Sequence, residues 1–185
     1  MSIFRLRRDS TQFLMIDVQQ RLLPAISNSE EIHGNILKLA RAADVLGVPF
    51  LYTEQYPRGL GPTDEVLLRA LPEGSPRFEK TSFSCCDEEG FEAVLESRGK
   101  PDVALFGIET HICVLATVLD LLGRGTRVAV VADACGSRYA GNSSMALDAM
   151  RSAGALVLPT ETAIYHLMGR SGTPEFKELL PLFKD

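Results

Sequence analysis

The sequence contains no tryptophan and three histidines, and it lacks both a Cys-x-x-Cys pair and a long uninterrupted apolar run. A membrane-spanning helix needs about 20 consecutive apolar residues, so no segment is predicted to cross a bilayer. His33, His111 and His166 lie far apart in the chain, so a zinc-finger site has little support. These absences argue against a membrane-spanning protein and against a structural zinc site.

Positive charge is also scarce. The chain has 19 Lys plus Arg against 24 Asp plus Glu, a formal net charge of -5, and its basic residues cluster only at Arg5, Arg7 and Arg8. Such a chain is a poor candidate for binding nucleic acid, and a small-molecule substrate is expected instead. The first ten residues lack the apolar segment of a secretory signal, so a cytoplasmic location is expected.

The four cysteines are expected to be reduced. A chain of 185 residues can form a hydrophobic core without disulfides, and Cys85 and Cys86 are too close in sequence for an unstrained bridge. Cys135 is expected to be a small core residue. Thiol redox chemistry, through the neighbouring Cys85 and Cys86 or through Cys113, is a weaker functional hypothesis than the two given at the end of this section.

The composition, with 45% hydrophobic and 23% charged residues, predicts one globular domain spanning residues 1–185. Short apolar runs alternate with amphipathic segments, which is typical of βα units on a parallel sheet. Strands are predicted at 11–18, 48–53, 103–108, 127–132 and 155–158, and helices at 30–46, 63–71, 87–98, 111–122, 143–153, 160–168 and 175–183. The segment Glu54–Pro62 is predicted to be an exposed loop.

Ligands of parallel α/β sheets bind beyond the carboxyl ends of the strands. That rule selects four places in this chain: Asp17, Glu54–Tyr56, Glu109–Cys113 and Asp133–Arg138. Functional residues are therefore expected at these four places.

Cys113 is the strongest candidate nucleophile. It lies in the first turn of the helix predicted after residues 103–108, where the helix dipole and free backbone N–H groups favour a thiolate and could hold an oxyanion. The alternative is that Cys113 simply packs in the core. Asp17 lies at the end of an apolar strand and is either a general base or a helix N-cap. Lys80 is either a cation beside the thiol or a surface charge.

Three stretches together resemble the isochorismatase-like cysteine hydrolases, a superfamily that includes nicotinamidases and N-carbamoylsarcosine amidohydrolases. They are FLMIDVQ around Asp17, FEKTSFS around Lys80 and GIETHICV around Cys113, in that order and at those spacings. The resemblance extends from about residue 11 to residue 168. The stretch TEQYPRGLGPT is similar in particular to a poorly characterised isochorismatase-domain subgroup.

The resemblance implies a three-layer α/β/α Rossmann-like fold with a six-stranded, mostly parallel sheet. It also implies a triad in which Asp17 is the general base, Lys80 stabilises the thiolate and Cys113 attacks a carbonyl carbon to form a thioester. A cis peptide bond is implied between Ile108 and Glu109. The backbone N–H groups of Glu109 and Cys113 would then form the oxyanion hole.

The departures from the family matter as well. Isochorismatase itself lacks the nucleophilic cysteine, so Cys113 indicates amide or related acyl chemistry. Nicotinamidases bind a metal through histidines in the region that reads TEQYP here, so no metal and no cofactor are expected. Glu54, Gln55 and Tyr56 are candidate substrate contacts, as is Thr110.

His111 and the pair of Asp133 and Arg138 are given structural roles. His111 is expected to start a helix or to lie at an interface, and Asp133 and Arg138 are expected to form a structural ion pair, within the chain or across a subunit boundary. A homo-oligomer is expected from the resemblance. The leading hypothesis is a cofactor-free cysteine hydrolase of small amides, and the alternative is a catalytically silent binding or assembly protein with the same fold.

Overall fold

A computed structural model describes residues 4–184 and contains one six-stranded sheet. The strands lie in the order β3-β2-β1-β4-β5-β6, and every neighbouring pair is parallel. Their bounds are β1 Thr11–Ile16, β2 Phe50–Gln55, β3 Arg77–Lys80, β4 Asp102–Ile108, β5 Arg127–Gly136 and β6 Leu156–Leu158.

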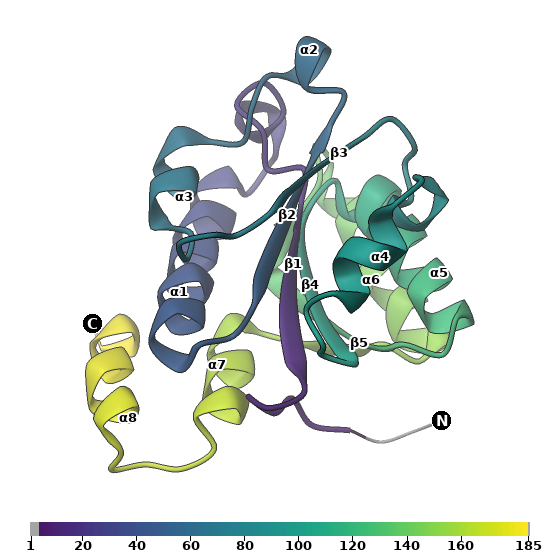
Figure 1. The fold of residues 1–185 in the computed structure, drawn as a ribbon. Coiled ribbons are helices and arrows are strands. Elements are labelled where there is room, and N and C mark those ends of the chain that lie inside the picture. The colour runs from purple at the N-terminus through teal and green to yellow at the C-terminus, as the bar shows by residue number, and fades with distance from the viewer. Residues whose placement is uncertain (1–3, 185) are drawn as a thin grey trace.

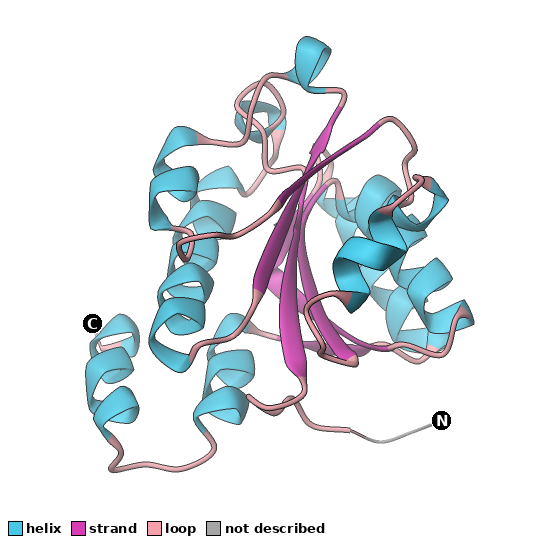
Figure 2. Cartoon of the chain, in the orientation of Figure 1, coloured by secondary structure: helices cyan, strands magenta, loops and turns pink. Residues whose placement is uncertain are grey.

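Helices cover both faces of this sheet. In Figure 1, α1, α3, α7 and α8 lie on one side of the strands and α4, α5 and α6 on the other, and Figure 2 shows the same three layers by element type. Their bounds are α1 Ser29–Leu46, α2 Pro57–Leu60, α3 Glu65–Ala70, α4 Phe91–Glu96, α5 Leu115–Gly123, α6 Ala140–Ala153, α7 Thr160–Met168 and α8 Pro174–Leu179, with a π-helical turn at Thr110–Val114. The predicted three-layer fold is confirmed.

The central strands are apolar because both of their faces are covered. Every residue of β1 and β4 is buried, as expected for parallel strands between two helical layers. Phe13, Phe50 and Phe106, from β1, β2 and β4, meet edge to face with ring centroids 5.7 to 6.0 Å apart. This aromatic cluster fixes the three strands whose carboxyl ends form the site.

The direction in which the strands are added reverses between β1 and β4. The chain runs outward from β1 through β2 to β3, and then returns to form β4 on the other side of β1. At such a reversal the connections diverge to opposite faces of the sheet, leaving room at the strand ends. The carboxyl ends of β1 and β4 lead directly into Asp17 and Glu109.

Three details differ from the sequence predictions. The edge strand β3 was not evident from periodicity, because its short run alternates exposed and partly covered residues. Strand β5 continues to Gly136, four residues beyond its predicted end. The predicted exposed loop at Glu54–Pro62 is wrong in its first part, since β2 extends through Gln55 and α2 follows.

Within residues 4–184, no helix combines the length and apolar character needed to span a bilayer.

One glycine allows β1 and β4 to approach closely. Gly107 has φ +129°, and a Cβ atom there would lie 2.1 Å from the carbonyl oxygen of Ile16. We expect Gly107→Ala to lower the free energy of unfolding by about 2–4 kcal/mol, because backbone atoms must move apart and the φ is strained. Urea unfolding followed by circular dichroism measures the change.

Gly123→Ala is the matched control. A Cβ atom on Gly123 meets no heavy atom within 4 Å, and its helical position favours alanine by about 0.5–1 kcal/mol. Equal unfolding midpoints for the two variants would contradict the close approach of β1 and β4.

Candidate functional site

Asp17 stands directly after β1 with its side chain fully buried. Its φ of +53° is in the left-handed region, which Asp adopts more readily than most residues. The hydroxyl of Thr53 donates to Oδ1 at 2.6 Å, and the ammonium of Lys80 donates to Oδ2 at 2.7 Å. Both carboxylate oxygens therefore have a fixed partner, from β2 and β3 respectively.

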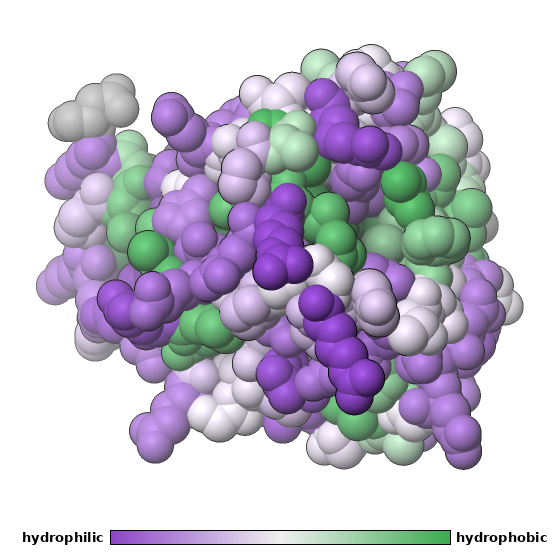
Figure 3. All heavy atoms as spheres, turned by 90° about the horizontal axis from the view of Figure 1, so that it is seen from above, coloured by the Kyte–Doolittle hydropathy of each residue, from purple (hydrophilic) through white to green (hydrophobic). Residues whose placement is uncertain are grey.

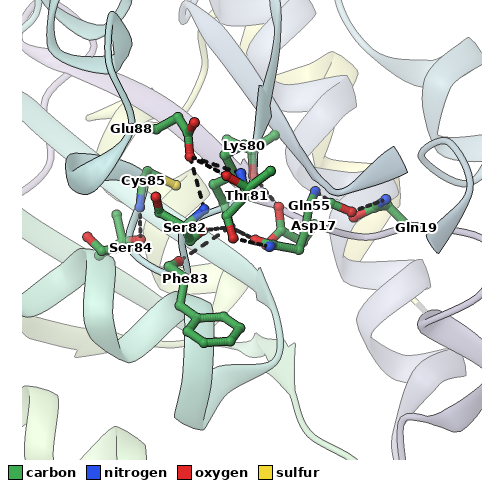
Figure 4. Close-up of polar contacts among 12 residues, drawn as sticks. Asp17, Gln19, Gln55, Lys80, Thr81, Ser82, Phe83, Ser84, Cys85 and Glu88 are labelled. Atoms are coloured by element: carbon green, nitrogen blue, oxygen red, sulfur yellow. Dashed lines mark hydrogen bonds and ion pairs between the residues drawn. The ribbon is translucent and has the colours of Figure 1, made fainter. Parts of the chain in front are cut away.

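Lys80 ends β3 and is also buried, with its side chain 0% exposed. Besides Asp17, its Nζ donates to Oε1 of Gln55 at 2.6 Å and to the carbonyls of Ser82 and Phe83 at 3.2 and 3.3 Å. Figure 4 shows these contacts converging on the ammonium. Burial is the largest influence and acts to lower the pKa of Lys80, but the Asp17 carboxylate together with smaller contributions from Cys85 and Cys113 outweighs it, and the pKa is raised overall. Lys80 is therefore a fixed cation.

The segment that follows Lys80 is held in place by a carboxylate. Oε2 of Glu88 accepts the backbone N–H groups of Thr81 and Ser82, both at 2.9 Å. These bonds lower the pKa of Glu88, so it remains ionised over a wide range. The turn thus aims the carbonyls of Ser82 and Phe83 at the ammonium, a role that the sequence did not reveal.

Cys113 lies in the π-helical turn between β4 and α5 and is 7% exposed. Burial, together with the negative charge of Asp17, raises the pKa of the Cys113 thiol to about 12, while Lys80 acts to lower it. The expectation that the helix start favours a thiolate is thus wrong for the resting state. The thiol stays protonated beside a carboxylate that can accept its proton.

The implied oxyanion donors are the N–H groups of Glu109, directly before this turn, and of Cys113, within it. The peptide bond between Ile108 and Glu109 is cis, as the resemblance implied. The carbonyl of Glu109 accepts the backbone N–H groups of Ile112 and Val114 at 3.1 and 3.3 Å, which ties the start of the turn to its end. A π-helical turn is rare and occurs frequently at functional sites.

Two of the candidate substrate contacts have structural partners instead. Glu54 is 1% exposed, and its Oε1 accepts both the N–H and the hydroxyl of Thr63 at 2.7 and 2.9 Å. Thr110 is 0% exposed, and its hydroxyl pairs with that of Ser143 at 3.0 Å. Neither side chain is free to meet a substrate in this conformation. Buried polar groups need such partners, which explains both placements.

Tyr56 remains accessible. It is 54% exposed, with φ +39°, and it begins the turn of helix α2. A hollow of about 300 Å³ is lined by Tyr56, Arg58, Glu79 and Glu88, and also by Lys80. Cys113 does not line this hollow. Of the four substrate-contact candidates, Tyr56 alone is fully at the surface, and it lines the same hollow as Lys80.

Asp133, within β5, and Arg138, just after it, pair differently from expectation. Arg138 donates from its backbone N and from Nε to the carboxylate of Glu109 at 3.0 and 3.1 Å, while Asp133 accepts the N–H and hydroxyl of Thr160. The predicted ion pair between Asp133 and Arg138 is therefore wrong within the chain, where each has another partner, and a pair across a subunit boundary stays a prediction. His111 bonds through Nδ1 to the Ser137 hydroxyl at 2.9 Å.

The four cysteines are free. Cys85 is fully buried close to Lys80, as Figure 4 shows, and Thr117 pairs with its backbone. Burial raises the pKa of Cys85 to about 12. Burial likewise raises the pKa of Cys135 to about 12.

Within residues 4–184, no group of three or more His, Cys, Asp or Glu side chains is arranged to hold a metal ion.

Comparison with known proteins gives one consistent assignment. A family model described as the isochorismatase domain matches residues 11–162. Isochorismatase domain-containing protein 1 of Salmo salar is 38% identical over 175 residues, 95% of this chain and 61% of that protein. The chain thus spans about three-fifths of that relative.

Two solved structures are similar over nearly their whole length. A Caenorhabditis elegans protein described as MAR1 ribonuclease is 38% identical, with a TM-score of 0.91, and 97% of this chain and 92% of that chain are covered. YcaC of Pseudomonas aeruginosa, in a structure with covalent acrylamide, is 25% identical, with a TM-score of 0.91 and coverage of 98% and 93%. The fold is that of isochorismatase-family hydrolases, and the chain belongs to the isochorismatase domain family.

Proposed function

We propose that this protein is a cofactor-free cysteine hydrolase of a small amide or related acyl substrate, with Cys113 as nucleophile. The observation that carries the proposal is the buried ion pair between Nζ of Lys80 and Oδ2 of Asp17, 2.7 Å apart, next to a buried thiol. Burying two charges is costly, so a purely structural role explains the pair poorly. A base, a cation and a nucleophile at the same edge of the sheet fit acyl transfer.

The proposed reaction begins with proton transfer from Sγ of Cys113 to the Asp17 carboxylate. The sulfur then forms a bond to the amide carbon, and the resulting oxyanion is held by the backbone N–H groups of Glu109 and Cys113. When the C–N bond breaks, the leaving nitrogen takes the proton from Asp17. A thioester remains on Cys113.

The second half returns the enzyme to its starting state. Asp17, again a carboxylate, takes a proton from water, and the oxygen attacks the thioester carbon. The C–S bond then breaks, and the proton held by Asp17 returns to sulfur. Lys80 remains protonated throughout because its N–H groups are engaged by Asp17, Gln55 and two carbonyls. Its charge lowers the energy of the thiolate as it forms.

Hydrolysis of a panel of small primary amides, followed by ammonia release, tests the nucleophile. Cys113→Ala is expected to reduce turnover by at least about a thousandfold, because the thioester cannot form. Cys86→Ala, which removes a half-buried thiol outside the Asp17–Lys80 cluster, is the control. Activity retained in Cys113→Ala would contradict the mechanism, and no turnover of any amide by the wild type would favour the silent binding protein.

Asp17→Asn separates thiol ionisation from catalysis. Because Asp17 acts to raise the pKa of Cys113, its replacement lowers that pKa, and alkylation of Cys113 by acrylamide moves to lower pH. Hydrolysis falls by about 10²–10⁴-fold, since the general base is gone. Peptide mass spectrometry measures the alkylation, and covalent acrylamide in the Pseudomonas aeruginosa YcaC structure supports the choice of reagent. Parallel changes in both rates would contradict the proposed role of Asp17.

A second candidate function is RNA cleavage, because the similar Caenorhabditis elegans structure is described as a ribonuclease. The net charge of -5 and the enclosure of Lys80 favour a small substrate over a polyanion. We expect no cleavage of fluorescently labelled single-stranded RNA beyond that of Cys113→Ala prepared identically. Cleavage that disappears with Cys113→Ala would replace the amide by a phosphodiester as the substrate.

Self-assembly and location remain predictions. Figure 3 looks onto the end of the sheet where Asp17 and Lys80 lie. Hydrophilic residues predominate there, and hydrophobic residues appear on several sides, with a larger group on the side of α5 and α6. Phe83, Leu119, Tyr139 and Met145 are all exposed, by 44 to 68%. A homo-oligomer would cover such side chains. A cytoplasmic location likewise stays a prediction from the sequence.

A further inference from the structure

Gln55 connects β2 to the two buried charges. Its side-chain Oε1 accepts from Nζ of Lys80 at 2.6 Å, and its Nε2 donates to the carbonyl of Thr81 at 2.6 Å. One amide thus holds both the ammonium and the turn that follows it, as Figure 4 shows. This arrangement uses the acceptor and one donor of the amide, which leaves little capacity to recognise a substrate.

The backbone of Gln55 is itself held on both sides. Its N–H donates to Oε1 of Gln19 at 2.8 Å, and its carbonyl accepts from Nε2 of Gln19 at 3.0 Å. Gln19 is 0% exposed and lies two residues after Asp17. The segment that carries Asp17 therefore also fixes the residue that holds Lys80, so the two charges are aligned from one framework.

The chemistry of the Gln55 side chain suits this place. Lys80 has three N–H donors, and its partners are the Asp17 carboxylate and three neutral oxygens, of which Gln55 gives the shortest contact. A neutral amide orients the ammonium without cancelling its charge. A second carboxylate there would cancel more of that charge and weaken its effect on Cys113.

We propose that Gln55 is a positioning residue that keeps the Lys80 ammonium against Asp17 and within reach of the Cys113 thiol. The proposal rests on the proposed function of Cys113 and replaces the interpretation of Gln55 as a substrate contact. Gln55 affects the reaction by fixing the position of the positively charged Lys80 side chain. The proposal therefore predicts changes both in Lys80 itself and in the pH dependence of Cys113.

The test compares Gln55→Met with the wild type. Methionine has similar length but no amide, so Lys80 loses one acceptor and the carbonyl of Thr81 loses its donor. Hydrogen exchange of the Lys80 ammonium, followed by nitrogen-15 NMR, is expected to accelerate at least about tenfold, the lower end of what one hydrogen bond to a charged group provides. Alkylation of Cys113 by acrylamide is expected to slow about three- to tenfold near neutral pH and to move to higher pH, because a displaced cation lowers the thiol pKa less.

Gln20→Met is the matched control, with the same chemical change at an exposed side chain. It is expected to leave Lys80 exchange and the alkylation profile unchanged. If Gln55→Met fails to fold by circular dichroism, Gln55→Asn keeps the amide but is one methylene too short to reach both partners, and the same two changes are expected.

The outcomes separate this proposal from the proposed function. Unchanged exchange at Lys80, or faster exchange with an unchanged alkylation profile, would overturn the positioning role. A rise in KM for the amide with both readouts unchanged would restore Gln55 as a substrate contact. If amide hydrolysis proves independent of Cys113 while both Lys80 exchange and Cys113 alkylation respond to Gln55→Met, the proposed function fails and the positioning of the Lys80 charge stands.

Discussion

The buried ion pair between Asp17 and Lys80 is the interaction on which the site depends. Both side chains are almost completely hidden from solvent, and removing each charge from water costs several kcal/mol, to order of magnitude. Such a pair persists only when other polar groups complete the shells of both ions. Thr53 supplies the remaining bond to Asp17, and Gln55 with two carbonyls completes Lys80.

The fold supplies these partners because of its strand order. β1, β2 and β3 are neighbours, so Asp17, Thr53 and Lys80 reach the same edge of the sheet from three adjacent strands. β4 lies on the other side of β1 and delivers the turn that contains Cys113. The nucleophile and the ion pair thus come from opposite sides of the point where the strand order reverses, and each is held by a strand or by the turn that follows it. Rigid supports of this kind keep reacting groups in a fixed geometry.

The sequence predicts the fold better than it predicts the partners. Buried parallel strands such as β1 and β4 leave a continuous apolar pattern, whereas the edge strand β3 is short and half exposed and leaves none. Motif resemblance located Asp17, Lys80 and Cys113. It did not reveal that Glu54 bonds Thr63, since a buried carboxylate and a solvated one have the same letter in the sequence.

Contacts between distant segments explain the remaining differences. The partner of Arg138 is Glu109, 29 residues away, and the sequence pattern favoured the nearer Asp133. Burial and the charge of Asp17 raise the pKa of Cys113, and neither is visible from the position of the cysteine in the sequence. Gln55 looked like a loop residue because the extension of β2 was not visible. Its contacts with Lys80 and Thr81 exist only in the folded chain.

The most direct test of the account is the ionisation of Cys113 in the resting protein. Ultraviolet absorbance of the thiolate, taken as the difference between wild type and Cys113→Ala across a pH titration, isolates this one group. The account predicts no Cys113 thiolate at or below the ordinary cysteine pKa of about 8.5, because burial and Asp17 keep the proton on sulfur. A thiolate that forms well below that pH would contradict the claim that Asp17 must take the proton during the reaction.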